Sequence, residues 1–387
     1  MQPEPFKIDI PQQSLDDLAT RLRGTRWAPE ANNADWSFGT NGAYLRELVQ
    51  YWLDEYDWRA SETAMNELDH YRVTIDDIPI HFVKVSSPSP HAKPLLLTHG
   101  WPWTFWDFRK IIGPLSDPES YGGDARDAFE IIIPSLPGFA FSTPLAQSGL
   151  NWVSTADLWA KLMTDVLGYD RFAAAGGDFG GFVALQMGHK YPQFVTGVHT
   201  TLALPFPIFR TDRPWSLGSL AEDESSPQVD PWERKFASHM AVQMLEPQTL
   251  AWSMHDSPVG MAAWLIQRKR TWSDCGGDLE SRFTKDELLD LVNLYWFTDS
   301  FGSSIRFYSD TMNATWAPSR TEMPMVTVPT GFSLFPKDVP PPTDREWLEE
   351  YFNLRLARYH ENGGHFSHAE EPEILATDIR DTFRGLS

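Results

Sequence analysis

The residues whose type and spacing could do chemistry begin at positions 176–181, which read GGDFGG. The run of small residues Ala173–Gly177 before Asp178 predicts a buried strand, and Phe182–Lys190 after it predicts a helix. Small residues around one reactive side chain at a strand-to-helix turn are typical of a nucleophile elbow, because that turn is strained and leaves no room for bulk. The sequence therefore predicts that Asp178 projects above a sheet as a nucleophile.

A carboxylate at this position, where serine is commoner, indicates a particular chemistry. A carboxylate can attack a saturated carbon and form an alkyl ester on the enzyme. Water can then clear the ester by attacking the carboxyl carbon of Asp178 itself, whereas a serine nucleophile would leave an ether with no such exit. The substitution therefore favours epoxides or alkyl halides over peptides or esters as substrates.

A nucleophile of this kind needs a histidine to activate water and a carboxylate to orient that histidine. Of the 11 histidines, His365 is the best placed, because it lies between the last predicted strand and the last predicted helix. Loops at the carboxyl edge of a parallel sheet meet at the ligand site. Asp338 follows the preceding predicted strand and is the predicted acid, with Asp344 and Glu346 as nearby alternatives. The resulting chain order of nucleophile, acid and base is that of α/β-hydrolases.

Two backbone N–H groups are predicted to hold the oxyanion that water attack would create. One belongs to Phe179, directly after the nucleophile. The other belongs to Trp101 in the stretch HGWP at 99–102, which closes an earlier predicted strand. We assign no catalytic role to His99.

The elements that must position these residues show strand–helix alternation. Residues 71–75 and 80–85 alternate as in an antiparallel pair, with the bend near Ile78-Pro79. Later runs are apolar throughout, as in strands buried on both faces, and helical stretches such as 154–167 and the terminal helix from about residue 372 separate or follow them. These runs are 94–98, 129–134, 173–177, 325–330 and 356–359. The pattern predicts an α/β fold with a mostly parallel sheet and helices on both faces.

Two further regions are predicted to be helical. In residues 1–70, Ser14 caps a predicted amphipathic helix and a second helix spans 44–56. Between 205 and 315, a predicted loop at 205–231 leads into helices at 232–245, 260–269 and 285–295. We therefore divide the chain into an N-terminal helical region (1–70), a first part of the core (71–204), a helical cap inserted over the site (205–315) and a second part of the core (316–387).

Composition narrows the classes of partner. The 53 acidic and 32 basic residues give a net charge of −21, which argues against nucleic acid and anionic membranes. A lone cysteine, Cys275, excludes an internal disulfide framework. We see no signal peptide and no apolar run long enough for a membrane anchor, so the cytoplasm is the expected location. We expect no cofactor and no metal. The 17 Trp and 24 Phe favour a site lined by aromatic rings.

Motifs spread over nearly the whole chain resemble those of microsomal-type epoxide hydrolases, including their N-terminal region. They are FKI at 6–8, TRW at 25–27, YDWR at 56–59, HGWP at 99–102, PSLPGF at 134–139, GDFG at 177–180, DSPVG at 256–260, RFY at 306–308, GGHF at 363–366 and EEPE at 370–373. The resemblance implies an α/β-hydrolase fold and the roles given above to Asp178, Asp338 and His365. It also implies that Tyr308 of the cap donates a hydrogen bond to the epoxide oxygen.

The chain departs from the family at two positions. His239 stands where a second cap tyrosine is usual, which leaves four alternatives: His239 donates in its place, Tyr308 acts alone, epoxide activation is impaired, or another substrate is handled. Phe179 stands where tryptophan is frequent, and we expect little effect because only its backbone N–H is required. The resemblance thus implies an enzyme that converts an epoxide and water into a vicinal diol. The many aromatic residues favour a small apolar or aromatic epoxide as its substrate, and we expect a homodimer as its assembly.

Two other functions remain open from the sequence. A haloalkane dehalogenase would use the same nucleophile, but it needs a side-chain N–H to hold halide, and Phe179 has none. A non-catalytic binding protein of the same fold is disfavoured by the intact set of Asp178, Asp338 and His365.

Overall fold

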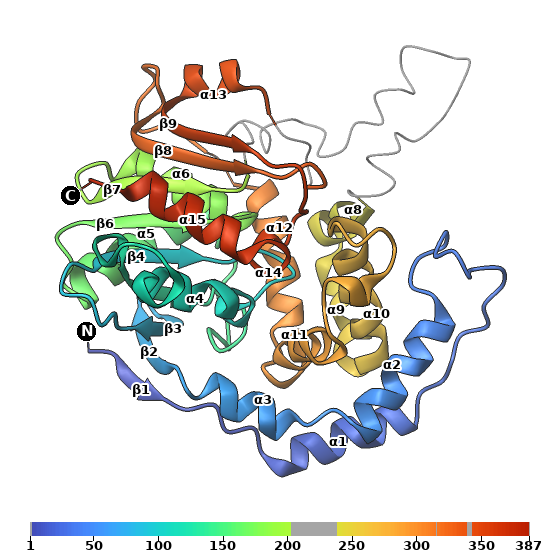
Figure 1. Cartoon of the computed structure of the whole chain (residues 1–387). Coiled ribbons are helices and arrows are strands. Elements are labelled where there is room, and N and C mark those ends of the chain that lie inside the picture. The colour runs from blue at the N-terminus through green and yellow to red at the C-terminus, as the bar shows by residue number, and fades with distance from the viewer. Residues whose placement is uncertain (1, 203–237, 315, 339–342, 387) are drawn as a thin grey trace, which may run out of the picture.

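A single sheet organises the computed structural model, which describes residues 2–202, 238–314, 316–338 and 343–386 (Figure 1). Within these residues the sheet has nine strands in the order β1-β2-β3-β5-β4-β6-β7-β8-β9. Their bounds are β1 Glu4–Phe6, β2 Asp69–Ile75, β3 Ile78–Val85, β4 Lys93–Thr98, β5 Phe129–Pro134, β6 Phe172–Gly176, β7 Val195–Thr200, β8 Val326–Leu334 and β9 Phe352–Tyr359. The first three strands and the β3–β5 pair are antiparallel, and every pair from β5 to β9 is parallel.

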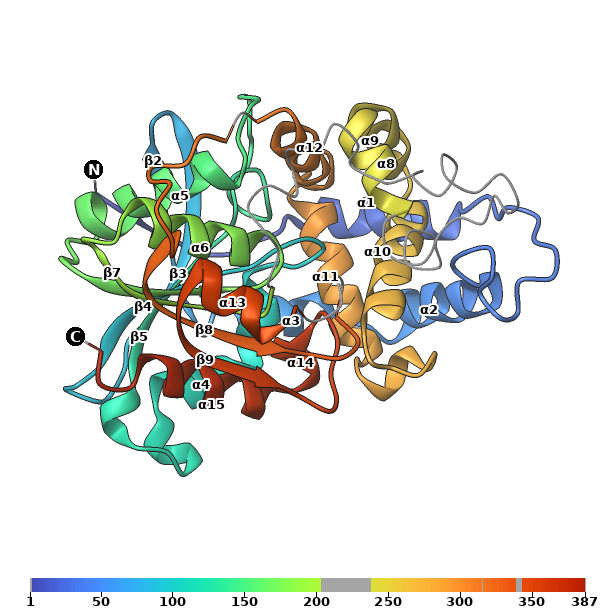
Figure 2. The ribbon, with the colours of Figure 1, turned by 90° about the horizontal axis from the view of Figure 1, so that it is seen from above.

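Helices cover both faces of this sheet (Figure 2). Helix α5 (Trp152–Lys161) packs with α6 (Phe179–Lys190) on one face, and α4 (Arg109–Ser116) packs with α15 (Pro372–Phe383) on the other. The strands between them are apolar on both sides, as in β4, where Leu95, Leu96 and Leu97 are at most 1% exposed. The predicted α/β-hydrolase arrangement is confirmed. Short helices α13 (Arg345–Tyr351) and α14 (Ser367–Glu370) flank β9 in sequence.

Between β7 and β8, the described residues of the cap are helical and lie beside the carboxyl ends of the parallel strands (Figure 1). They form α8 (Ser238–Leu245), α9 (Pro247–Asp256), α10 (Pro258–Trp272), α11 (Lys285–Phe297) and α12 (Phe301–Met312). The sequence predicted neither α9 nor α12 as helices. The predicted loop at 205–231 and the start of the predicted helix at 232–245 lie outside the described residues.

The N-terminal region runs along the cap and supports it (Figure 1). Its helices are α1 (Gln12–Arg23), α2 (Gly42–Asp54) and α3 (Trp58–Met65). Arg21 of α1 binds Asp256 of the cap at 2.9 Å, and Lys285 of α11 binds Glu47 of α2 at 2.6 Å. The N-terminal region therefore contacts the cap through surface ion pairs and through the packing of α1 and α2 against α10 and of α2 against α11.

Several local predictions were wrong for identifiable reasons. Residues 4–6 form strand β1, so the region before residue 71 is not helical throughout. Helix α1 begins after Pro11, and Ser14 lies in its first turn rather than at its cap. The bend between β2 and β3 is formed by Asp76 and Asp77, both at positive φ (50° and 64°), as in a type I′ turn. Pro79 is instead part of β3, where pairing with β5 covers only Phe82–Val85.

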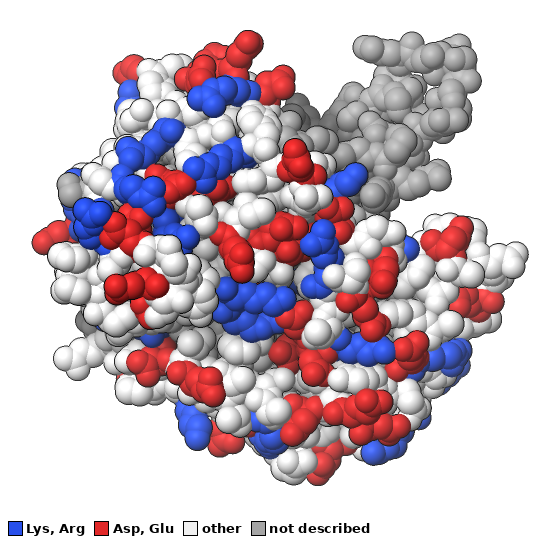
Figure 3. Space-filling view, in the orientation of Figure 1, with Lys and Arg blue, Asp and Glu red and all other residues white. Residues whose placement is uncertain are grey.

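Charge is distributed without a basic stripe on the face shown in Figure 3, where Lys and Arg are interspersed with Asp and Glu. Several of these charges form ion pairs, such as Lys161 with Asp76 at 2.6 Å. None of the described helices is both long enough and apolar enough to cross a membrane.

Candidate active site

The elbow at the end of β6 places Asp178 above the sheet. Asp178 has φ 52° and ψ −130°, a conformation that is strained for a residue with a side chain. The neighbouring glycines are required by space as well: a Cβ on Gly180 would lie 1.9 Å from the Thr98 carbonyl oxygen, and one on Gly177 would lie 2.8 Å from the Trp103 ring. Helix α6 begins directly at Phe179, three residues earlier than predicted, because Asp178 is its N-cap.

One oxygen of Asp178 occupies a pair of backbone N–H donors. Its Oδ1 accepts from the N–H of Phe179 at 2.7 Å and from the N–H of Trp101 at 3.0 Å. Gly100 permits this approach, because a Cβ there would lie 2.3 Å from the Cβ of Asp178. The two donors predicted for the oxyanion therefore converge on one point, as an oxyanion hole requires.

His99 holds the loop that carries the Trp101 N–H. The backbone N–H of Leu136 points at His99 Nε2 at 3.1 Å, so Nε2 is the acceptor and Nδ1 carries the proton that is donated to the Gly100 carbonyl at 2.9 Å. Complete burial lowers the pKa of His99 to about 4, so the ring is neutral. This position agrees with a structural rather than a catalytic use of His99.

His365 lies between two carboxylates. Its Nδ1 is 2.7 Å from Asp338 Oδ1, and its Nε2 is 3.3 Å from Asp178 Oδ2. His365 and Asp338 are buried, at 3% and 7% exposure. Burial lowers the pKa of His365, but the charges and hydrogen bonds of Asp338 and Asp178 outweigh burial and raise it to about 10. The ring is therefore an imidazolium at neutral pH.

The two alternative acids lie elsewhere. Asp344 is the exposed N-cap residue of α13, and Glu346 is an exposed residue in the first turn of that helix. Both are on the protein surface, so among the three acids considered the structure brings only Asp338 to His365.

The cap contributes a second group of side chains around the nucleophile. The Tyr308 hydroxyl of α12 is 3.2 Å from Nε2 of His239 in α8. The His239 ring stacks on Trp101 with centroids 5.5 Å apart, and the Tyr308 ring meets Phe179 at 4.7 Å. Burial and the charge of Asp178 raise the pKa of Tyr308 well above its ordinary value, so the hydroxyl remains a proton donor. The residue that departs from the family pattern thus lies beside the expected tyrosine.

The loop that carries His365 is fixed to the cap by backbone hydrogen bonds. The N–H of His365 donates to the Trp272 carbonyl at 2.9 Å, and the N–H of Gly363 donates to Asp274 Oδ2 at 3.0 Å. Glu370 joins the two segments, because it accepts from Phe366 N at 2.9 Å and from Asp274 N at 2.6 Å. Burial raises the pKa of Glu370 to about 7. The sequence offered no role for Glu370, because its partners are backbone groups of a distant segment.

A buried ion pair joins the cap to the core beneath this loop. Lys269 of α10 binds Asp107, which lies in the 3-10 helix Phe105–Phe108, at 2.8 Å. The Lys269 ammonium also lies 4.0 Å from the centroid of the Phe366 ring. His368 packs near the same pair, with its ring 4.0 Å from that of Trp103. These residues were also missed by the sequence, since 162 positions separate Lys269 from Asp107.

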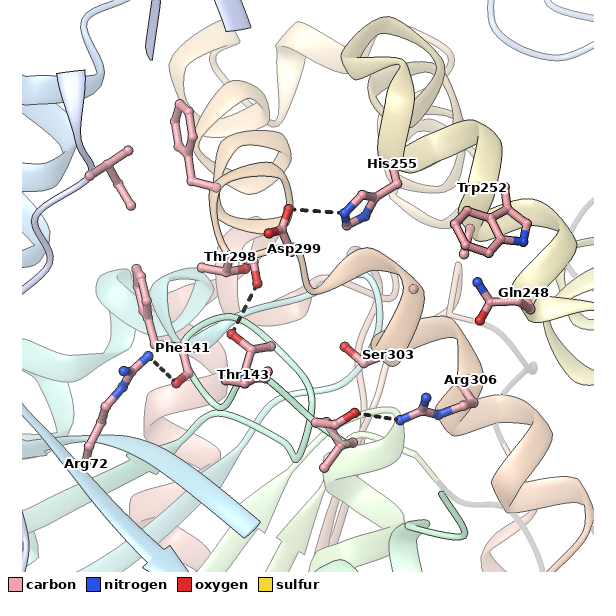
Figure 4. Close-up of a pocket in the computed structure, with 16 residues that line it drawn as sticks. Arg72, Phe141, Thr143, Gln248, Trp252, His255, Thr298, Asp299, Ser303 and Arg306 are labelled. Atoms are coloured by element: carbon pink, nitrogen blue, oxygen red, sulfur yellow. Dashed lines mark hydrogen bonds and ion pairs between the residues drawn. The ribbon is translucent and has the colours of Figure 1, made fainter. Parts of the chain in front are cut away.

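Figure 4 shows a pocket of about 590 Å³ away from the nucleophile, between α9, the start of α12 and the loop 141–145. Its charged side chains are held by protein groups: Arg72 donates to the Phe141 carbonyl at 2.9 Å, Arg306 donates to the Leu145 carbonyl at 3.2 Å, and His255 lies 3.3 Å from Asp299. Within the described ranges, no group of three or more His, Cys, Asp or Glu side chains is arranged to hold a metal ion.

Comparisons with known proteins agree with this geometry. Residues 3–108 match the family model "Epoxide hydrolase N terminus", and residues 93–248 match "alpha/beta hydrolase fold". Epoxide hydrolase 1 of Sus scrofa is 34% identical and aligns with 99% of this chain and 88% of its own. The crystal structure of juvenile hormone epoxide hydrolase from Bombyx mori superposes with a TM-score of 0.81 at 27% identity, covering 98% of this chain and 93% of that one. The Aspergillus niger epoxide hydrolase structure gives 0.79 at 29% identity, covering 100% and 97%.

The sheet, the elbow and the inserted cap define a hydrolase of the α/β-hydrolase fold. Within that class, the chain belongs to the epoxide hydrolase family. The family resemblance seen in the sequence is confirmed.

Proposed function

We propose that this epoxide hydrolase opens its substrate through an alkyl ester on Asp178 and releases a vicinal diol. The observation that carries the proposal is that the two oxygens of the Asp178 carboxylate have different partners. Its Oδ1 lies between two N–H donors, and its Oδ2 faces the imidazole that Asp338 orients. One oxygen is thus free to attack while the other already occupies the place where negative charge must later be held.

In the first step, Asp178 Oδ2 attacks an epoxide carbon from the side opposite the ring oxygen. A C–O bond to Oδ2 forms, and the epoxide C–O bond breaks. The Tyr308 hydroxyl donates to the developing alkoxide, which is a poor leaving group without such a donor. The raised pKa of Tyr308 supports this role, because the phenol keeps its proton at neutral pH.

In the second step, the ester on Asp178 changes the protonation of His365. Esterification removes one of the two negative charges that raise the pKa of His365, so its pKa falls. The ring then loses its proton to solvent, which balances the proton that the alkoxide takes through Tyr308 and His239, and the neutral ring can act as a base. His365 then takes a proton from water as the water oxygen attacks Cγ of Asp178. The oxyanion forms on Oδ1, held by the N–H groups of Trp101 and Phe179, and collapse expels the diol oxygen, which takes the proton from His365. The new carboxyl group of Asp178 then gives its remaining proton to His365, which restores the carboxylate and the imidazolium.

His239 is proposed to act with Tyr308 in place of a second tyrosine. Its Nε2 lies 3.2 Å from the Tyr308 hydroxyl, which supports this alternative over a tyrosine acting alone. The imidazole can return a proton to the phenol after the alkoxide has taken one.

The substrate is proposed to be a small apolar or aromatic epoxide. Rings of Trp101, Phe179 and Trp272 surround the catalytic side chains and favour apolar substituents. The proposed location is the cytoplasm. The proposed assembly is a homodimer, and sedimentation of the purified protein would test it.

One observation favours a second function, dehalogenation. The indole Nε1 of Trp101 is buried and has no hydrogen-bond partner, and the backbone N–H of the same residue contacts Asp178. Trp101 therefore offers a side-chain N–H for halide, which Phe179 lacks. Assays for halide release and diol formation with matched alkyl halides and epoxides would separate the two activities.

A single turnover in H₂¹⁸O tests the proposal directly. The diol should contain no heavy oxygen, and the peptide that contains Asp178 should gain one. Asp178→Ala should form neither diol nor ester, and it avoids the deamidation that could restore an Asn variant. Heavy oxygen found in the diol after one turnover would overturn the alkyl-enzyme mechanism, because water would then have attacked the epoxide directly.

A further inference from the structure

A buried cation in the cap has no use in the proposed reaction. Arg268 of α10 is 6% exposed, and its Nη1 donates to the Ser238 hydroxyl at 2.8 Å. Its guanidinium lies 5.2 Å from the centroid of the Trp264 ring, and its Nε has no hydrogen-bond partner. No carboxylate among the described residues forms an ion pair with it. A buried charge without a counter-ion is costly, so such a group is typical of a site that an anion occupies.

Arg268 lines a pocket of about 1060 Å³ between α10, Ser238 and the loop 36–40. Among the described residues that line it, two more are cations, Arg270 and Lys337, and one is a carboxylate, Asp274. That carboxylate already accepts the N–H of Gly363 at 3.0 Å. The local balance is therefore positive in a protein whose net charge is −21. Such a reversal favours an anionic ligand at this one place.

The pocket wall contains sequence neighbours of two residues of the candidate active site. Ser238 on its wall precedes His239, which contacts the Tyr308 hydroxyl. Ser273 on its wall follows Trp272, whose ring lies 4.7 Å from His239 and 5.2 Å from His365 between centroids. Burial lowers the pKa of Arg268 and the Tyr308 hydroxyl acts against this shift, so the guanidinium and the epoxide-opening phenol lie close enough to interact electrostatically. A substrate branch that passes His239 would therefore reach Arg268.

We propose that Arg268 binds a carboxylate at the end of an otherwise apolar or aromatic substrate, so that the preferred substrate is an epoxide whose branch past His239 toward α10 ends in a carboxylate. The inference rests on the proposed function. A carboxylate fits better than a phosphate, because one planar guanidinium matches its two oxygens. The rest of the described wall mixes apolar and aromatic side chains, such as Met254, Ala263 and Trp264, with neutral polar ones.

The test compares epoxy carboxylic acids with their methyl esters over a series of chain lengths between epoxide and carboxylate. We expect the wild-type enzyme to prefer the acid in kcat/KM by roughly 10- to 100-fold at the matching length, as for a charge-assisted hydrogen bond. Arg268→Gln should bring the ratio of acid to ester toward one, and Arg268→Lys should keep part of the preference. Because the ratio is taken within each protein, a loss of folded enzyme cancels.

The matched control is Arg306→Gln, the same substitution in the cap pocket of Figure 4. It should leave the ratio of acid to ester as in the wild type. The inference is overturned if the wild-type enzyme favours no acid at any chain length, if Arg268→Gln retains the preference, or if Arg306→Gln loses it equally. Failure to convert either acid or ester to diol would instead overturn the proposed function.

Discussion

The backbone of the catalytic loop, residues 363–366, and the side chains of the cap face differ in how their buried polar groups are paired. The cap face consists of His239, Gln243, Arg268, Tyr308 and Thr311. In the catalytic loop, the N–H groups of Gly363, His365 and Phe366 each donate to a fixed acceptor. On the cap face, Gln243 is 0% exposed with both amide atoms unpartnered, and the Thr311 hydroxyl and Arg268 Nε are also buried without partners.

This difference in pairing corresponds to two tasks, which are positioning of the catalytic base and binding of the substrate. The base must stay within a fraction of an ångström of its target, and the catalytic loop is held accordingly. Buried polar groups without partners destabilise a fold, and they are tolerated where a ligand supplies the missing contacts. We infer that the catalytic loop is built for one reaction geometry and that the cap face is built to bind polar groups of a substrate.

The largest expected effect comes from replacing the catalytic base of the loop, His365. His365→Gln should lower steady-state turnover by about 10³- to 10⁴-fold, because no group remains to activate water. The first step does not need this base, so the alkyl ester on Asp178 should accumulate and be visible as a mass increase after mixing with epoxide. An unmodified enzyme together with lost turnover would place His365 in the first step instead.

Replacing the hydrogen-bond donor of the cap face, Tyr308, should slow the first step, which forms the ester. Tyr308→Phe should lower kcat/KM by about 10²-fold, as for the loss of one donor to a developing oxyanion. Rapid-quench measurements should show slow ester formation and no accumulated ester. If ester accumulates as in His365→Gln, Tyr308 does not serve the epoxide oxygen.

The link between the catalytic loop and the cap can be tested through Glu370. In Glu370→Gln, an amide NH₂ must face one of the two N–H donors that the carboxylate accepts, so we expect about a tenfold loss in kcat. Glu371→Gln is the matched control, because Glu371 binds Arg282 and accepts no N–H from the catalytic loop.

The same pair of variants should differ in the pH dependence of stability. Burial raises the pKa of Glu370 from 4.5 to about 7, so the folded protein holds this proton more tightly than the unfolded chain does. Its contribution to the free energy of unfolding is present below pH 4.5 and is lost as the pH rises to about 7. Glu370→Gln should flatten this decline by up to about 1.4 kcal/mol per pH unit. Denaturant titrations at several pH values would contradict this prediction if the free energy of unfolding falls with pH as steeply in Glu370→Gln as in the wild type.

The smallest effect is expected from Gln243. Gln243→Met removes a buried amide without partners and should raise the free energy of unfolding by about 1 kcal/mol. Gln186→Met is the control, because the buried Gln186 accepts from Trp316 Nε1 at 3.1 Å and its loss should destabilise. Equal effects of the two variants in thermal melts would mean that the cap face carries no unsatisfied polar group at this position.

The local features of the fold and site could be predicted from sequence. The GGDFGG turn is such a feature, because strain, small neighbours and the following helix all lie within a few residues of Asp178. Buried strands such as β4 are equally local. Helices α9 and α12 were missed because the sequence FGSSIRFYSDTM of α12, with its glycine and serines, has weak helix propensity, and the two helices stabilise each other by contact.

The residues that were missed have partners far away in the chain. Glu370 meets the N–H of Asp274 across 96 positions, and Lys269 meets Asp107 across 162. No periodicity or spacing encodes such a pair, and without the fold each residue reads as an ordinary surface charge. Arg268 is the same case in stronger form, since only its burial and its lack of a carboxylate distinguish it from other helical arginines.

The two oxygens of Asp178 have different hydrogen-bond partners, and we expect them to differ in whether they exchange with solvent during turnover. Oδ1 sits in two backbone hydrogen bonds at 2.7 and 3.0 Å, whereas Oδ2 faces only the imidazole, at 3.3 Å. In the proposed cycle Oδ2 departs with every molecule of product, an oxygen from solvent replaces it, and Oδ1 never leaves. After many cycles in heavy-oxygen water, Asp178 should still contain one light oxygen. The enzyme would thus replace one carboxylate oxygen in every cycle and retain the other through all of them.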